Sequence, residues 1–185
     1  MNYRAEFPDC PPETMPAIPA TWLDQSWHND ACPCFNTGKG LVVFIDFADT
    51  ASRECPETKR FTAHSCDENG GPIDVVFETD DWNELLAFLI GLRFSTALKE
   101  QLTPAQFAEM KRLNATADYA SGCCASHNFC DANMVMAPAF EEIMGRALIA
   151  ENSDVGMTDA DCRIVNAAWD SARHHFIGSP ARQTA

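Results

Sequence analysis

The chain has 185 residues, enough for one domain or two small ones with a substantial hydrophobic core. Its formal net charge of −14 at pH 7 argues against direct binding to DNA, RNA or anionic membranes, because basic surfaces hold those ligands. The longest apolar run, residues 85–92, is too short to span a bilayer.

The thiols and the N-terminal sequence indicate the compartment. No basic leader followed by an apolar run precedes the body of the chain, and the nine cysteines are an odd number. Since a core of this size needs no disulfide framework, we expect reduced thiols and a cytoplasmic location.

Prolines dominate the first twenty residues. Because proline fits neither a helix interior nor a central strand, residues 1–21 are expected to form an extended arm. The five prolines are Pro8, Pro11, Pro12, Pro16 and Pro19.

Residues 22–79 carry the pattern of four strands joined by short turns. The glycine-containing turn NTGKG at 36–40 precedes residues 41–47, which are rich in valine, isoleucine and phenylalanine. The turn ENGGP at 68–72 separates residues 59–66 from residues 73–79, as is typical of a hairpin. The sequence therefore predicts a four-stranded antiparallel meander with one buried face.

A helix is predicted directly after the last strand. Asp81 is placed to cap it, and Glu84 lies three residues further on, in a capping-box arrangement. Gly91 lowers the helix propensity of this segment. We expect this helix to cover the sheet, so that residues 22–100 form one region. Its buried stripe would consist of Leu85, Phe88, Leu89 and Leu92.

The rest of the chain is predicted to be mostly helical and packed on the sheet. Thr103 with Pro104, and Thr158 further on, are typical helix starts within residues 101–178. Pro138 would either kink a helix with an apolar stripe at 136–148 or be its first residue. Residues 179–185 read as a frayed tail. Because strands come first and helices follow, the predicted fold class is α+β.

Cysteine, histidine and aspartate gather at the start of residues 121–148. Cys124, His127 and Cys130 are spaced by three, and Asp131 follows His127 by four, so on a helix these side chains share a face. Thiolate and imidazole are the usual ligands of zinc. The alternative is a set of buried thiols around a hydrogen-bonded histidine.

We expect this cluster to lack a complete zinc site, and we predict no cofactor. Cys123 and Cys124 are adjacent and would point about 100° apart on a helix, so only three ligands could converge where a structural zinc needs four. The site could be completed only by Cys162, or by Cys32 and Cys34.

No reaction motif is present. The sequence has no Walker loop, no GxGxxG, no HExxH and no GxSxG, and the thiols of the CPC motif at 32–34 are one residue apart. A Cys–His enzyme remains the alternative, because such partners meet in space. It would need His127, Cys130 and Asp131 to converge with His28 or His64 in a pocket.

Two further stretches are candidates for binding. Trp27, His28, Asn29 and Asp30 could form a polar site with an aromatic wall, or simply a strand end that begins a turn. Residues 67–84 hold seven acids and no lysine or arginine, which fits either an acidic face for a basic nucleic-acid-binding protein or a solvated hairpin tip. These acids are Asp67, Glu68, Asp74, Glu78, Asp80, Asp81 and Glu84.

Four stretches together resemble uncharacterised proteins of bacterial integrative elements, plasmids and phages. They are SWHNDACP at 26–33, FIDFAD at 44–49, ETDDWNELLAF at 78–88 and ASHNFCDANMVM at 125–136. The resemblance implies a cytosolic accessory protein of a mobile element, and it transfers no catalytic residue.

The sequence thus predicts a non-enzymatic acidic protein that acts through protein–protein contacts. The alternative is a small Cys/His-dependent enzyme or a metal-binding sensor centred on residues 123–131.

Overall fold

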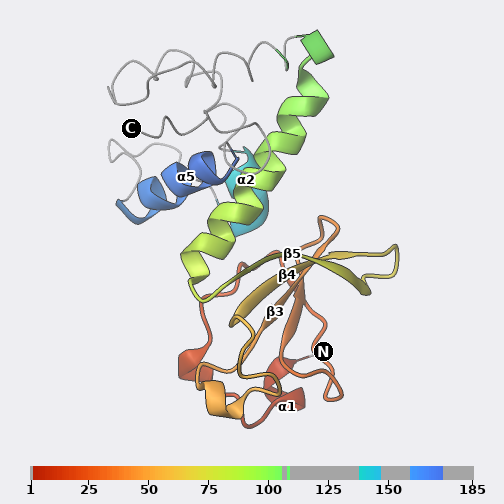
Figure 1. Cartoon of the computed structure of the whole chain (residues 1–185), viewed down its shortest axis with the longest axis vertical. Coiled ribbons are helices and arrows are strands. Elements are labelled where there is room, and N and C mark those ends of the chain that lie inside the picture. The colour runs from red at the N-terminus through yellow and green to blue at the C-terminus, as the bar shows by residue number, and fades with distance from the viewer. Residues whose placement is uncertain (1, 106–107, 109–137, 147–158, 173–185) are drawn as a thin grey trace. The chain divides into compact units, whose positions relative to one another are not determined.

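The computed structural model describes residues 2–105, 108, 138–146 and 159–172 (Figure 1). The chain divides into two compact units, Met1–Leu85 and Leu86–Ala185, and the division falls within the helix α2 (Trp82–Gln101). An antiparallel sheet in the first unit, together with the helices, confirms the predicted α+β class.

The sheet has five strands in sequence order, each antiparallel to its neighbours. The strands are β1 (Leu23–Asp24), β2 (Cys34–Asn36), β3 (Leu41–Ile45), β4 (Phe61–Cys66) and β5 (Pro72–Thr79). The predicted antiparallel meander is present, with five strands where four were expected; the additional strand is the short β1, and a turn separates it from β2. Between them the amide of Asp30 donates to the carbonyl of Trp27 at 2.8 Å, and Pro33 has no amide to donate to a ladder.

The central strand β3 supplies much of the core of the first unit. Val42, Val43 and Ile45 are fully buried, as the apolar composition of this segment predicts. Both predicted glycine turns are present: Gly40 ends the β2–β3 turn with φ = 72°, and Gly70 lies in the β4–β5 turn with φ = 83°.

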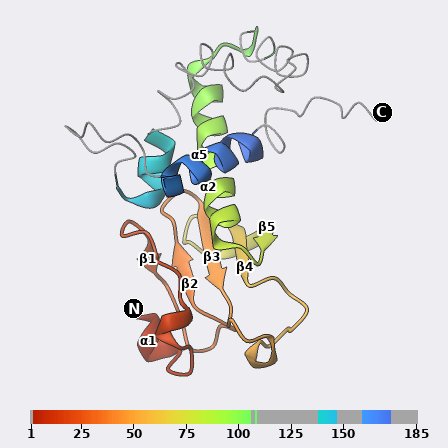
Figure 2. The same ribbon diagram turned by 90° about the vertical axis from the view of Figure 1, so that its left-hand side faces the viewer.

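The N-terminal arm is not uniformly extended. It contains one turn of α-helix, α1 (Tyr3–Glu6), which Asn2 caps by accepting from the amide of Arg4 at 3.1 Å, and a 3₁₀ turn at Pro12–Thr14. The amide of Tyr3 donates to the carboxylate of Asp24 at 2.6 Å, which holds α1 beside β1 and β2 (Figure 2).

Helix α2 begins where the sequence predicts, but through a different set of hydrogen bonds. Asp81 caps it by accepting from the amide of Asn83 at 2.8 Å. Glu84 does not close a capping box; it accepts from the hydroxyl of Thr79 at 2.6 Å, and that hydroxyl accepts from the amide of Asp81 at 3.1 Å. The threonine therefore links the end of β5 to the first turn of the helix. None of the helices in the described part of the chain is long and apolar enough to cross a membrane.

In the second unit, α2 packs closely against α5 (Asp159–Ala172) at Gly91. A methyl group on Gly91 would lie 2.7 Å from the carbonyl oxygen of Ala168 and 3.0 Å from the amide nitrogen of Ala172. The rings of Phe94 and Trp169 meet edge-to-face, with centroids 5.6 Å apart. The glycine is required by this close approach of two backbones.

A further helical segment, residues 138–144, also belongs to the second unit. It buries Phe140 and Ile143 as predicted, and it ends at Gly145, whose φ of 66° suits a helix C-terminus. Pro138 lies within it; the residues before Pro138, the expected cap Thr158 and the tail 179–185 lie outside the described residues.

We expect the substitution Gly91→Ala to destabilise the second unit by about 1–3 kcal/mol, although alanine is the better helix former. The reason is that the added methyl group would force α2 and α5 apart. Thr96→Ala, at an exposed position of the same helix, is the control and should change the free energy of unfolding by less than about 0.5 kcal/mol. Chemical denaturation measures both; a stabilised Gly91→Ala variant would contradict the close packing.

Candidate functional site

The outer strand β5 carries an exposed apolar surface. Ile73, Val75 and Val76 are 60%, 55% and 39% exposed, although their composition is that of a buried strand. Among the described strands β5 has only one neighbour, β4, so it forms an edge of the sheet. Long exposed apolar edges are rare in soluble proteins because they invite pairing with another chain. This edge is therefore a candidate interaction surface.

The acidic run predicted at residues 67–84 surrounds the same strand, and all seven of its acids are exposed. Four of them have structural partners. Asp67 accepts from the amides of Asn69 and Gly71, both at 2.8 Å, and so shapes the β4–β5 turn. Asp81 and Glu84 organise the start of α2, and Asp80 binds Lys59.

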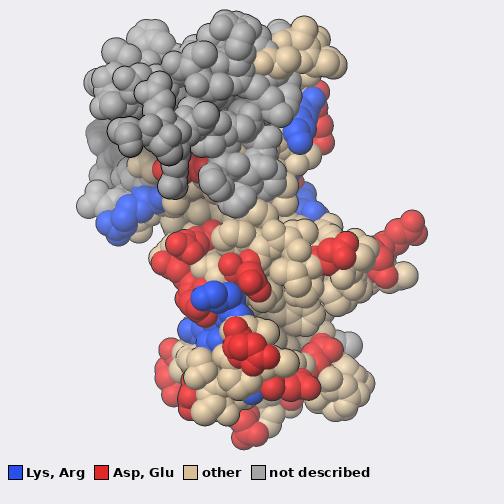
Figure 3. Space-filling view, in the orientation of Figure 1, with Lys and Arg blue, Asp and Glu red and all other residues tan. Residues whose placement is uncertain are grey.

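Three further acids contribute to the charge of the surface: Glu68 in the turn, and Asp74 and Glu78 on β5. Figure 3 shows the acidic side chains that gather at the protruding tip of the hairpin. We call the exposed side chains of β5 together with these three acids the β5 surface.

The pairing of β4 with β5 is irregular. Its register shifts between Ala63 and His64 and again between His64 and Cys66, so β5 carries extra residues relative to β4. At the second shift the hydroxyl of Ser65 accepts from the amide of Asp74 at 3.2 Å and donates to the carbonyl of Asp74 at 3.5 Å. The Ser65 hydroxyl thus provides hydrogen-bond partners for the amide and the carbonyl of Asp74 in the bulge.

His64 lies opposite Val75 at the centre of this irregular pairing. Its ring packs edge-on against Phe44, with centroids 5.0 Å apart, and its Nε2 lies 3.2 Å from the hydroxyl of Thr62. Partial burial lowers the pKa of His64 below its usual value of 6.5, so the ring is neutral at pH 7.

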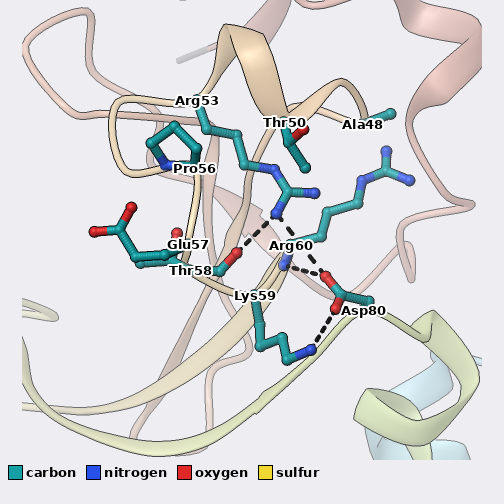
Figure 4. Close-up of a pocket in the computed structure, with 9 residues that line it drawn as sticks. All are labelled: Ala48, Thr50, Arg53, Pro56, Glu57, Thr58, Lys59, Arg60 and Asp80. Carbon is teal, nitrogen blue, oxygen red and sulfur yellow. Dashed lines mark hydrogen bonds and ion pairs between the residues drawn. The ribbon is translucent and has the colours of Figure 1, made fainter.

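A polar depression of about 500 Å³ lies where the β3–β4 connection meets the end of β5 (Figure 4). Arg53 is its most buried cation, with a side chain only 5% exposed. The guanidinium donates to the carbonyls of Phe47 and Thr58 at 2.8 and 2.7 Å, and lies 3.9 Å from Asp80. The depression is lined by Ala48, Thr50, Arg53, Pro56, Glu57, Thr58, Lys59, Arg60 and Asp80.

Asp80 is the acceptor that the basic groups of the depression share. Its carboxylate accepts from Lys59 at 2.6 Å and from the amide of Arg60 at 3.0 Å, and these bonds lower the pKa of Asp80. The Arg60 side chain instead donates to the carbonyls of Asp46 and Thr14. Because the cations already have acceptors within the chain, the depression is better suited to fixing the loop than to holding a ligand.

The four residues at 27–30, predicted to bind, lie in the connection between β1 and β2. The structure has the turn arrangement: the Trp27 ring, 45% exposed, lies 4.3 Å from the ring of His28, and Nδ1 of His28 lies 3.0 Å from the carboxylate of Glu6. Asn29 and Asp30 are exposed. A binding role for these residues stays a prediction.

The described thiols of the CPC motif are packing groups. Cys32 and Cys34 are buried, and burial together with nearby acids raises the pKa of Cys34 to about 12 and that of Cys32 further. Burial likewise raises the pKa of Cys10. The raised pKa values favour the protonated thiols, which are poor nucleophiles.

The predicted catalytic and metal cluster is not described by the structure. Cys123, Cys124, His127, Cys130 and Asp131 lie outside the described residues, as does the side chain of Cys162. Within the described part of the chain no three His, Cys, Asp or Glu side chains are grouped to hold a metal ion. The zinc prediction therefore stays a prediction.

We expect Arg53→Met to lower the free energy of unfolding by about 2–4 kcal/mol, since two carbonyls would lose a charged donor. Arg53→Lys keeps the charge but cannot reach both carbonyls, so it should recover less than half of this loss. Lys59→Met, which removes an exposed cation from Asp80, is the control and should have a much smaller effect. Urea denaturation followed by tryptophan fluorescence decides; equal losses for Arg53→Met and Lys59→Met would contradict a clamp centred on Arg53.

We also expect the stability of the first unit to fall on acidification through His64. The pKa of His64 is lower in the folded chain than in the unfolded chain, so the unfolded chain binds the proton first. The stabilisation is complete above about pH 6.5 and is lost as the pH falls from there toward the folded pKa. Denaturation at pH 7.5 and 5.5 should show a smaller loss for His64→Gln than for the unmodified chain. Identical losses would contradict this role.

Comparison with known proteins finds no matching family model, no matching curated protein and no matching solved structure.

Proposed function

We propose that this chain is an acidic, non-enzymatic accessory protein that acts through protein–protein contacts, and that the β5 surface docks a basic partner. The observation that carries the proposal is the combination on one edge strand of exposed apolar and acidic side chains. Val75 and Val76 offer apolar area, while Asp74 and Glu78 supply exposed negative charge on the same strand.

The two kinds of side chain would contribute differently to binding. Apolar area removed from water provides affinity, at about 25 cal/mol per Å² before the costs of association are subtracted. The acids, within a chain of net charge −14, would speed the encounter with a basic partner and exclude acidic ones. A protein whose basic surface ordinarily holds nucleic acid has the matching chemistry.

The resemblance to proteins of bacterial mobile elements supports this setting, in which a small cytoplasmic accessory protein would meet such partners. The alternative function, a Cys/His-dependent enzyme or metal sensor at residues 123–131, rests on residues that the structure does not describe. It therefore stays a prediction.

The test uses two synthetic probes of equal positive charge, an extended peptide with the repeat Lys-Lys-Val-Val and a helical peptide of lysine, leucine and alanine. We expect at least one to bind, and the double substitution Asp74→Asn/Glu78→Gln to weaken that binding about 3- to 30-fold, which is two cross-chain ion pairs of about 0.3–1 kcal/mol each. Fluorescence anisotropy at low and physiological salt measures both.

The control is the double substitution Asp9→Asn/Glu13→Gln, which removes the same two kinds of acid from exposed positions outside the hairpin. It should change the affinity less than about twofold. Equal weakening by both double variants would mean attraction by the net charge alone, and no binding of either probe would also contradict the proposal.

A further inference from the structure

We infer that the partner docks by strand addition, in which an extended basic and apolar segment pairs its main chain with the outer edge of β5. This inference rests on the proposed function and specifies its mode. Strand addition requires backbone groups of β5 that face away from β4. The hydrogen bonds between β4 and β3 show which residues of β5 these are.

The backbone of β4 alternates between its two neighbours. The amide of Asp46 donates to the carbonyl of Arg60 at 2.8 Å, and the amide of Cys66 donates to the carbonyl of Gly40 at 3.0 Å. Because successive residues of an antiparallel strand direct their N–H and C=O to opposite sides, Thr62 and His64 also point toward β3. The residues between them point toward β5.

The partners of Thr62 and His64 on β5 are Glu78 and Val75. Since these pairs exchange no main-chain hydrogen bonds, Glu78 and Val75 direct their N–H and C=O groups away from β4, toward the outer edge. Both residues are exposed, and no described strand lies on that side of β5. The edge therefore offers two outward-facing sets of a donor and an acceptor.

The irregular register leaves the outward-facing backbone groups of β5 on the same side of the strand. One extra residue between Ala63 and His64 leaves Val75 and Glu78 three apart in the chain but facing the same way. The Ser65 hydroxyl completes the bulged backbone at Asp74 from the β4 side. Pro72 has no amide and lies at the start of β5, so the usable edge is the part of the strand that follows it.

The side chains on this edge specify the chemistry of the added strand. Val75 and Glu78 share the sheet face of His64 and Thr62, so a strand paired with β5 would place an apolar residue against Val75 and a lysine or arginine against Glu78. Alternate side chains then give specificity while main-chain bonds give affinity.

A second copy of this chain is a poor occupant. Antiparallel pairing of two β5 edges would bring the carboxylates of Asp74 and Glu78 from both copies close together, and like charges on neighbouring strands destabilise a strand pair. Each copy also carries a net charge of −14. A basic segment meets neither obstacle.

The first experiment removes one outward-facing donor. Val75→Pro should weaken binding of the extended lysine–valine peptide at least about tenfold, because the ring replaces the N–H and blocks close approach of the added strand. Val75→Thr keeps the amide and the branched shape, and it should weaken binding less than about threefold. Proline is tolerated on an edge where its nitrogen faces solvent, so the melting temperature of Val75→Pro should stay close to that of Val75→Thr.

The second experiment needs no variant and so does not depend on the folding of Val75→Pro. Amide hydrogen exchange of the unmodified chain is followed by NMR with and without the peptide. The amides of Val75 and Glu78 should exchange at least about tenfold more slowly in the complex. The amide of Phe77, opposite Ala63 and directed toward β4, should change little.

The outcomes separate this inference from the proposed function. Binding that depends on Asp74 and Glu78 but leaves the Val75 and Glu78 amides unprotected, or that favours the helical probe, would overturn strand addition and leave the docking proposal intact. Loss of the charge dependence would overturn both. Dimers of the free chain, detected by sedimentation, whose formation is blocked by Val75→Pro would assign the edge to a second copy and would also overturn the inference.

Discussion

The buried guanidinium of Arg53 is the interaction on which the exposed edge depends. It satisfies the carbonyls of Phe47 and Thr58 in the connection between β3 and β4, and it lies beside Asp80 at the end of β5. A cation withdrawn from water in this way is stable only where acceptors surround it, so the β3–β4 connection and Asp80, which follows β5, must come together. A strand that pairs on one side only is thereby held at its C-terminal end.

Much of the first unit could be predicted because its signals are local. Gly40 and Gly70 supply the positive φ that their turns need, and Asp81 caps the helix that follows the sheet. The two elements that were missed, β1 and α1, are too short to carry a hydrophobic period. The exposure of β5 was not predictable either, because valine and isoleucine in a strand ordinarily indicate burial, and only the pairing of distant segments determines which strand is at the edge.

The candidate site was predictable in composition but not in geometry. The acidic run at 67–84 is plain in the sequence, yet the sequence does not reveal that Asp67 closes a turn while Asp80 holds a lysine. Arg53 gave no signal at all, since an isolated arginine in a loop is ordinarily solvated. Gly91 reads as a weak point of a helix, whereas the structure shows that its missing side chain admits the backbone of α5. In each case the role is set by a residue remote in the chain, which local patterns do not encode.

The exposed edge of β5 also has a consequence for the solubility of the chain. A run of β-branched residues on an edge strand is a template for cross-β aggregation, and Asp74 and Glu78 are the carboxylates within this run. Asp74 and Glu78 would therefore limit aggregation as well as contribute to recognition. An apolar residue at either position would favour fibril formation through the exposed edge of β5.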